Sequence, residues 1–203
     1  MNKPLDLTKL KVFPLKQRLS KTSVETVLVD PDSIPEKCDA TNLERIRQCA
    51  QNIVAARKRN ASVMLIYGAH LLKNGGQKII IELMKRGWMT HLATNGAGTI
   101  HDWELAFLGR TEESVEANVA TGTFGTWDET GRNIHLALLA GGLEGKGYGE
   151  SLGQFMAEDG VTLPSVESLE NLLKTEPLHP LTPARADLLQ AMCLHQLAAG
   201  RHE

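Results

Sequence analysis

Residues 62–109 read SVMLIYGAHLLKNGGQKIIIELMKRGWMTHLATNGAGTIHDWELAFLG, and this stretch decides the fold. Residues 62–67 form a short apolar run without polar alternation, which predicts a strand buried on both faces. Residues 77–86 carry apolar side chains at helical spacing and are followed by Gly87, a residue type that commonly ends a helix. A second short strand is predicted at residues 91–93.

A second helix is predicted over residues 100–108, so strands and helices alternate along this stretch. Such short connections favour a parallel sheet with right-handed crossovers. We therefore expect an α/β fold, Rossmann-like and three-layered with a parallel sheet. Ligands in such sheets bind beyond the carboxyl ends of the strands. Those ends are the loop at residues 68–70 and the turn that begins at Asn95.

Three regions are expected along the chain. Residues 1–37 predict an N-terminal arm, residues 38–160 the Rossmann-like domain, and residues 161–203 a C-terminal helical segment. Within the arm, an apolar run predicts a strand at residues 24–29. The capping-box sequence at residues 41–44 predicts the start of the first helix of the domain.

The composition excludes several classes of protein. The 203 residues are 42% hydrophobic and carry a net charge of -2, so no basic stripe points to nucleic acid. No apolar run reaches the roughly 18 residues that span a bilayer, and the basic N-terminus lacks the apolar core of a signal peptide. We expect a cytoplasmic protein that contacts no membrane. Cys38, Cys49 and Cys193 lack metal or disulfide spacing and are expected to be reduced, buried thiols.

Residues 94–104, TNGAGTIHDWE, are the candidate functional centre. Their glycines allow backbone N–H groups to approach a ligand, and a helix N-terminus favours an anion. The carboxylates of Asp102 and Glu104 can bind ribose hydroxyls or a cationic amine. The alternative is a capped turn with solvated acids. The adjacent His101 and the nearby loop with His70 favour the functional interpretation.

His70 follows the first predicted strand and is a candidate general base; the alternative is a histidine that stabilises its own loop. A metal site built from His70, His91, His101, Asp102 and His135 matches no known ligand spacing, so no metal is expected.

Two further glycine-rich stretches lie downstream. Residues 145–149 do not form a phosphate loop, because Ala140 stands where the first glycine is required and Lys146 is followed by glycine. They predict a flexible turn or, alternatively, a mobile lid. Residues 122–127 predict an ordinary loop or one that closes over a ligand. Without a nucleophile elbow or a cysteine in a nucleophile context, acyl-enzyme chemistry is not favoured.

Over about residues 60–155, the order strand, GAH loop, GG helix and THLATNGAGTIHDWELAFLG resembles the deoxyhypusine-synthase-like group of NAD-binding proteins. It is also similar to the conserved region of archaeal-type ornithine cyclodeaminases, in which a strand leads into a GNA-x-x-x-HD-x-E pattern. The residues that match this pattern here are Asn95, His101, Asp102 and Glu104.

The resemblance implies a Rossmann-like fold with NAD at the strand ends, where NAD oxidises an amine carbon to an imine. Carried over by position, His101, Asp102 and Glu104 border the nicotinamide or the amine substrate. His70 or His101 then moves protons. The residues implied to contact the dinucleotide are Gly68, Ala69, Thr94, Asn95, Gly96, Ala97 and Gly98.

The sequence departs from this family at the nucleophile. Deoxyhypusine synthases use a lysine late in a longer chain, and neither Lys146 nor Lys174 lies in a matching motif. The family resemblance implies a homo-oligomer, in which a second chain can complete the site. Two alternatives stay open: a non-catalytic or partner-completed nucleotide-binding subunit, and a sugar-phosphate isomerase or binding module.

Overall fold

The computed structural model describes residue 6, residues 9–35 and residues 37–203. The protein is a mixture of helix and strand, with small parallel and antiparallel sheets. Its contacts divide it into two compact units, Ser20–Glu113 and a discontinuous unit of Met1–Leu19 with Ser114–Glu203. The expected boundaries at residues 37 and 160 do not coincide with these limits. Residues 20–23 of the expected arm pair with a strand at residues 110–113 and so lie in the first unit. Residues 1–5, 7–8 and 36 of that arm lie outside the described residues.

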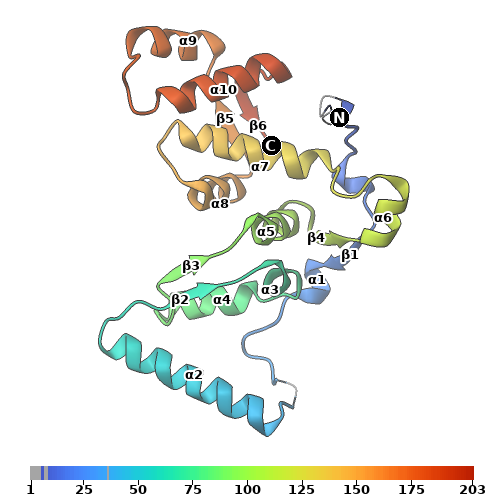
Figure 1. Ribbon diagram of the computed structural model, residues 1–203, viewed down its shortest axis with the longest axis vertical. Helices are drawn as coiled ribbons and strands as arrows, with labels where there is room; N and C mark the ends of the chain where they lie inside the picture. Colours follow the sequence, from blue (N-terminus) through green and yellow to red (C-terminus); the bar gives the residue numbers. More distant parts are fainter. Residues whose placement is uncertain (1–5, 7–8, 36) are drawn as a thin grey trace, which may run out of the picture. The chain divides into compact units, whose positions relative to one another are not determined.

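The unit Ser20–Glu113 contains the candidate centre. Its elements are β1 (Ser20–Ser23), α1 (Val24–Val27), α2 (Ala40–Lys58), β2 (Met64–Ile66), α3 (Ala69–Lys73), α4 (Gln77–Lys85), β3 (His91–Ala93), α5 (Gly96–Leu108) and β4 (Arg110–Glu113) (Figure 1). β2 and β3 pair in parallel, as the alternation of strands and helices predicts. β1 pairs with β4 in the antiparallel sense.

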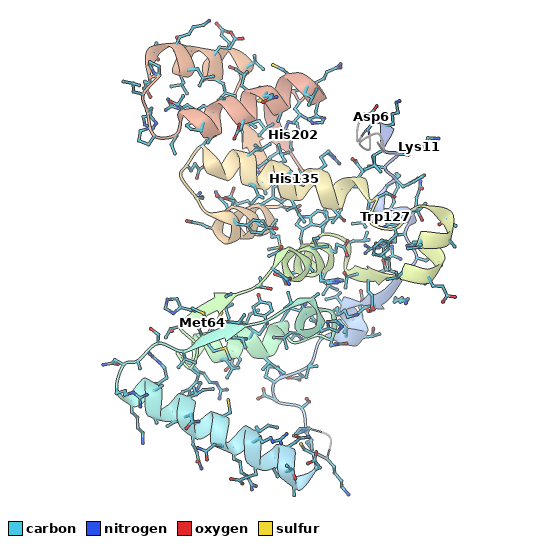
Figure 2. All side chains as sticks on the ribbon, viewed as in Figure 1. Asp6, Lys11, Met64, Trp127, His135 and His202 are labelled. Atoms are coloured by element: carbon cyan, nitrogen blue, oxygen red, sulfur yellow. The ribbon has the colours of Figure 1, made fainter. Side chains whose placement is uncertain are left out.

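The parallel pair is less covered than its apolar sequence predicts. In register, Met64 lies beside His91 and Ile66 beside Ala93. The side chains of Met64 (Figure 2) and Ile66 are 57% and 75% exposed, so the expectation of burial on both faces is wrong. Within the described residues β2 and β3 form a two-stranded sheet, and no third strand adjoins them.

The start of α5 replaces the tight turn expected at residues 95–98. The Asn95 side chain caps the helix by accepting a hydrogen bond from Gly98 N at 3.1 Å. An N-cap asparagine satisfies one of the backbone donors that a helix leaves free, which extends α5 four residues beyond the predicted start. Gly109, with a φ of 68°, ends the helix in the left-handed region.

Two other boundaries differ from the sequence predictions. The strand expected at residues 24–29 is wrong: the extended segment is β1, and α1 follows it. α2 is capped by Asp39, whose carboxylate accepts from Asn42 N at 2.9 Å, and not by the predicted Thr41. Aspartate and threonine are both good N-cap residues, and Asp39 and Thr41 are only two positions apart. The sequence alone therefore does not decide which of them caps α2.

The second unit is mainly helical. Its described elements are the 3-10 helix η2 (Leu15–Gln17), α6 (Val115–Thr121), α7 (Asp128–Gly142), α8 (Tyr148–Glu158), β5 (Val161–Leu163), α9 (Val166–Thr175), α10 (Thr182–His195) and β6 (Gly200–His202). α9 packs along α10 (Figure 1). The core of this unit also includes residues of α7 and β5, and its buried side chains are Leu136, Ala140, Leu163, Leu169, Leu188 and Met192. The predicted C-terminal helices are confirmed, but β5 and β6 add an antiparallel pair that was not predicted.

Cys38, Cys49 and Cys193 are all exposed, so the expectation of buried thiols is wrong. None of the helices in the described part of the chain has the length and apolar character needed to cross a membrane.

Candidate functional site

The carboxyl ends of β2 and β3 lie side by side and each leads directly into a helix. β2 continues through Tyr67 to Gly68, the N-cap of α3. β3 continues through Thr94 to Asn95, the N-cap of α5. Tyr67 N donates to Ala93 O at 2.9 Å, and Thr94 Oγ1 donates to Tyr67 O at 2.9 Å. The Gly68 and Asn95 loops therefore share one edge of the parallel pair.

The glycines of these loops serve different purposes. Gly68 and Gly96 are exposed, and a Cβ at either position would meet no other atom within 4 Å. Gly98 is buried, and a Cβ there would collide with Thr94 Oγ1. Gly68 and Gly96, together with the exposed Ala97, thus offer backbone to a ligand, whereas Gly98 permits the close packing of Thr94.

The histidine and glutamate of the HD-x-E pattern are joined by a residue that sequence analysis missed. His101 Nδ1 lies 2.7 Å from Thr111 Oγ1, and Thr111 Oγ1 donates to Glu104 Oε2 at 2.6 Å. Thr111 belongs to β4 and is 0% exposed, and Glu104 is 2% exposed. Glu104 is therefore a buried partner of Thr111 rather than a surface carboxylate.

Asp102 points to a different environment. Its carboxylate is half-buried, and burial raises the pKa of Asp102. The pKa of Tyr67 is raised mainly by burial and, to a smaller extent, by the negative charge of Asp102. The Asp102 carboxylate therefore influences the residue that follows β2. Among the described residues, no ion pair is formed by the Asp102 carboxylate and no group donates a hydrogen bond to it. Its charge therefore has no cationic partner in the described part of the chain.

His70, the other candidate base, lies on α3 and is exposed. Its carbonyl oxygen accepts from Asn74 N at 3.2 Å and Asn74 Nδ2 at 2.8 Å. Within the described residues its imidazole does not bond to a carboxylate. The structure thus keeps His70 beside Gly68 but gives it no acid–base partner.

An ion pair fixes α3 relative to β1 and β4. Lys73 Nζ lies 2.9 Å from Glu112 Oε1, and Thr22 Oγ1 donates to Glu112 Oε2 at 3.0 Å. The hydrogen bond from Lys73 holds the pKa of Glu112 below its usual value. The helix that follows Gly68 is thereby tied to the strand that carries Thr111.

Among the described residues, no group of three or more histidine, cysteine, aspartate or glutamate side chains is placed to hold a metal ion. His135, one of the residues considered for such a site, bonds through Nδ1 to Gly131 O at 2.6 Å.

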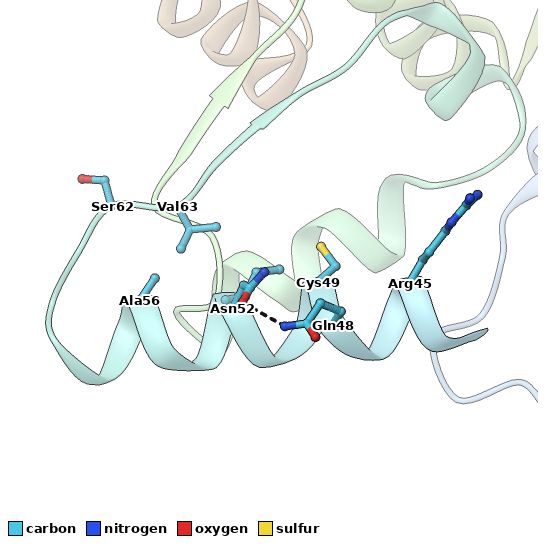
Figure 3. Close-up of a pocket in the computed structure, with 8 residues that line it drawn as sticks. Arg45, Gln48, Cys49, Asn52, Ala56, Ser62 and Val63 are labelled. Atoms are coloured by element: carbon cyan, nitrogen blue, oxygen red, sulfur yellow. Dashed lines mark hydrogen bonds between the residues drawn. The ribbon is translucent and has the colours of Figure 1, made fainter. Parts of the chain in front are cut away.

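A hollow of about 480 Å³ lies beside α2 (Figure 3). Its lining comes from α2 and from Ser62 and Val63, which precede β2. On the side of the hollow formed by α2, Gln48 Nε2 donates to Asn52 Oδ1, one turn further along the helix, at 3.3 Å. The hollow therefore adjoins the amino end of β2, opposite to the end that carries Gly68.

The glycine-rich residues 145–149 belong to the other unit. The Lys146 ammonium group bonds to Glu144 and to Gln154 Oε1. The hydrogen bond to Glu144 raises the pKa of Lys146. A raised pKa keeps the amine protonated, which makes Lys146 a poor nucleophile.

Comparison of the chain with protein-family models, with curated proteins and with solved structures finds no significant match. The fold and the site themselves define a mixed α/β protein with a parallel strand pair that opens into two helix starts.

Proposed function

We propose that this protein binds NAD, in a Rossmann-like three-layer arrangement, and uses it in chemistry on an amine or amino acid of the polyamine or ornithine type. One observation carries the proposal: the parallel strands β2 and β3 end together in loops with the exposed glycines Gly68 and Gly96. Ligands of parallel sheets bind beyond such strand ends.

The start of α5 supports the dinucleotide part of the proposal. The Asn95 side chain caps only the Gly98 N–H, and the N–H groups of Gly96 and Ala97 have no intrahelical acceptor. These donors and the dipole of a thirteen-residue helix favour a phosphate group. The open space at Gly96 lets a pyrophosphate approach the backbone. On the neighbouring loop, Gly68 and Ala69 supply the corresponding backbone.

Asp102 supports the amine part. Its carboxylate is half-buried without a cationic partner among the described residues, and this arrangement costs free energy until a cation binds. A substrate ammonium group supplies that cation through a charge-assisted hydrogen bond. Asp102 is thus the proposed amine ligand. Glu104 acts indirectly, through Thr111 and His101, and His101 is the proposed proton carrier with His70 as the second candidate.

We further propose a cytoplasmic homo-oligomer in which a second copy helps to complete the site. None of the nineteen residues of α2 is buried, although Leu43, Ile46, Ala50 and Ile53 follow the three-and-four spacing of a helix-packing face. Met64 and Ile66 of β2 are also exposed. Contiguous exposed apolar side chains mark protein–protein contacts.

A partner-completed nucleotide-binding subunit is the second candidate, and the state of Lys146 favours it. That lysine is held by Glu144 and Gln154 and is unsuited to attack an imine. The two candidates differ in one outcome: turnover of a polyamine with NAD by the purified chain alone eliminates the second.

Calorimetric titration with NAD tests the proposal. We expect the wild-type protein to bind NAD, and Gly96→Ala to weaken the affinity at least tenfold, which is about 1.4 kcal/mol. The matched control is Gly131→Ala, which adds the same methyl group at an open helical position in the other unit. Absence of NAD binding, or equal affinities for all three proteins, contradicts the proposal. Binding of sugar phosphates in place of NAD supports the sugar-phosphate alternative.

A further inference from the structure

The hydrogen bonds around Thr111 determine where the proton of His101 resides. The Thr111 hydroxyl has one proton and donates it to Glu104 Oε2 at 2.6 Å. The same oxygen lies 2.7 Å from His101 Nδ1. Because its proton is already directed to the carboxylate, the hydroxyl can only accept from the imidazole. Nδ1 must then carry a hydrogen.

We propose that Thr111 is a positioning residue that transmits the charge of buried Glu104 to His101 and fixes the neutral ring as the Nδ1–H tautomer. The lone pair of the neutral ring then resides on Nε2, which is the nitrogen that takes up a proton. When the ring becomes imidazolium, its Nδ1–H still donates to Thr111, and the Glu104 charge stabilises it through the hydroxyl. The tautomer is a property of the free protein and does not depend on what the site binds.

Burial protects this chain of hydrogen bonds from water. Thr111 is 0% exposed and Glu104 is 2% exposed, so water does not compete for the hydroxyl. An ionised carboxylate has no proton to donate, so in the hydrogen bond between Thr111 and Glu104 the hydroxyl is the donor. The opposite direction would require a protonated Glu104 that donates to Thr111.

The backbone holds the three residues in place. His101 and Glu104 are three residues apart on α5 and therefore lie on one helix face. Gly109 reverses the chain immediately after α5, so β4 brings Thr111 back to that face. The pairing of Thr111 with Thr22 in the β1–β4 register then fixes the position of the hydroxyl.

Long-range ¹H–¹⁵N correlation spectra of the histidine rings test the proposal, at a pH where His101 is neutral. The chain has seven histidines, and the loss of one set of signals in His101→Asn identifies this ring. We expect a protonated Nδ1 and an unprotonated Nε2 in the wild-type protein. A protonated Nε2 overturns the proposal.

Two substitutions at position 111 separate the hydroxyl from the shape of the side chain. Thr111→Val removes the hydroxyl with little change in shape, and the Nε2–H tautomer should then become the main form. Thr111→Ser keeps the hydroxyl and should keep Nδ1–H. An unchanged tautomer in Thr111→Val overturns the proposal, as does its loss in Thr111→Ser.

The matched control is Thr22→Val. Thr22 stands opposite Thr111 in the same strand pair, and its hydroxyl bonds to Glu112 instead of to the histidine chain. We expect this variant to retain the wild-type spectrum of His101. The same tautomer change in Thr22→Val and Thr111→Val would show that disturbance of the strand pair is responsible, and would overturn the role assigned to Thr111. Should Thr111→Val fail to fold, the wild-type and Thr111→Ser spectra still decide the tautomer.

Discussion

At the scale of single residues, Asp102 links stability to binding. Burial raises its folded-state pKa, so its stabilising contribution is complete below the pKa of the unfolded chain. That contribution is lost as the pH rises through the folded-state pKa. At neutral pH the half-buried charge therefore opposes folding, and it is available to a cationic ligand.

We expect Asp102→Asn to melt at a higher temperature than the wild type at neutral pH, because the buried charge is removed. The difference should shrink as the pH falls toward the acidic range, where Asp102 is protonated in both states. Thermal unfolding followed by circular dichroism over this pH range measures the effect. A variant that is less stable than wild type at neutral pH would mean that the charge has a stabilising partner.

Gly98 makes a second residue-scale prediction. A methyl group at this position collides with Thr94 Oγ1, which holds the β2 and β3 ends together through Tyr67 O. We expect Gly98→Ala to lower the free energy of unfolding by about 1–3 kcal/mol. Gly96→Ala should change it by less than about 0.5 kcal/mol, because its methyl group enters open space. Urea denaturation compares them, and equal losses would contradict the different packing of the two glycines.

At the scale of elements, α10 shows how burial determines the contribution of a side chain. Leu188 is 0% exposed in the core of its unit, whereas Leu194, on the same helix, is 71% exposed. We expect Leu188→Ala to cost about 2–5 kcal/mol of unfolding free energy. Leu194→Ala should cost less than about 0.5 kcal/mol. Chemical denaturation of both variants measures this contrast, and similar costs would show that α10 does not pack as described.

The elements that sequence predicted well are those with a local signal. Apolar spacing and Gly87 located α4, and the three-residue strand β3 was predicted at its observed bounds. β1, β4, β5 and β6 were missed because each pairs with a strand whose identity depends on the fold and not on neighbouring residues. The exposure of β2 could not be predicted either, because an apolar run does not show whether another element covers the strand.

The site was predictable to a similar extent. The parallel order of β2 and β3 follows from the alternation of elements, and it placed Gly68 and Asn95 at one edge. Helical spacing also predicts that His101 and Glu104 share one face of the helix and that Asp102 lies on another. Thr111 had no local signal, because its hydroxyl meets His101 only after Gly109 reverses the chain.

At the scale of the whole molecule, the exposed apolar side chains of α2 support a self-associating protein. We expect sedimentation velocity to give a species larger than the 22.2 kDa chain. Ile46→Glu should shift the protein toward the monomer, because it places a charge on the exposed apolar face. Gln51→Glu, which introduces the same charge on another face of α2, should not. A wild-type monomer at micromolar concentration would contradict this expectation.

We propose that NAD binds where β2 and β3 end. Hydrogen–deuterium exchange with and without NAD locates its contacts along the chain. We expect slower exchange with NAD at residues 68–70 and 95–98, which form the two loops at this edge. Unchanged exchange at both loops in the presence of saturating NAD would contradict it.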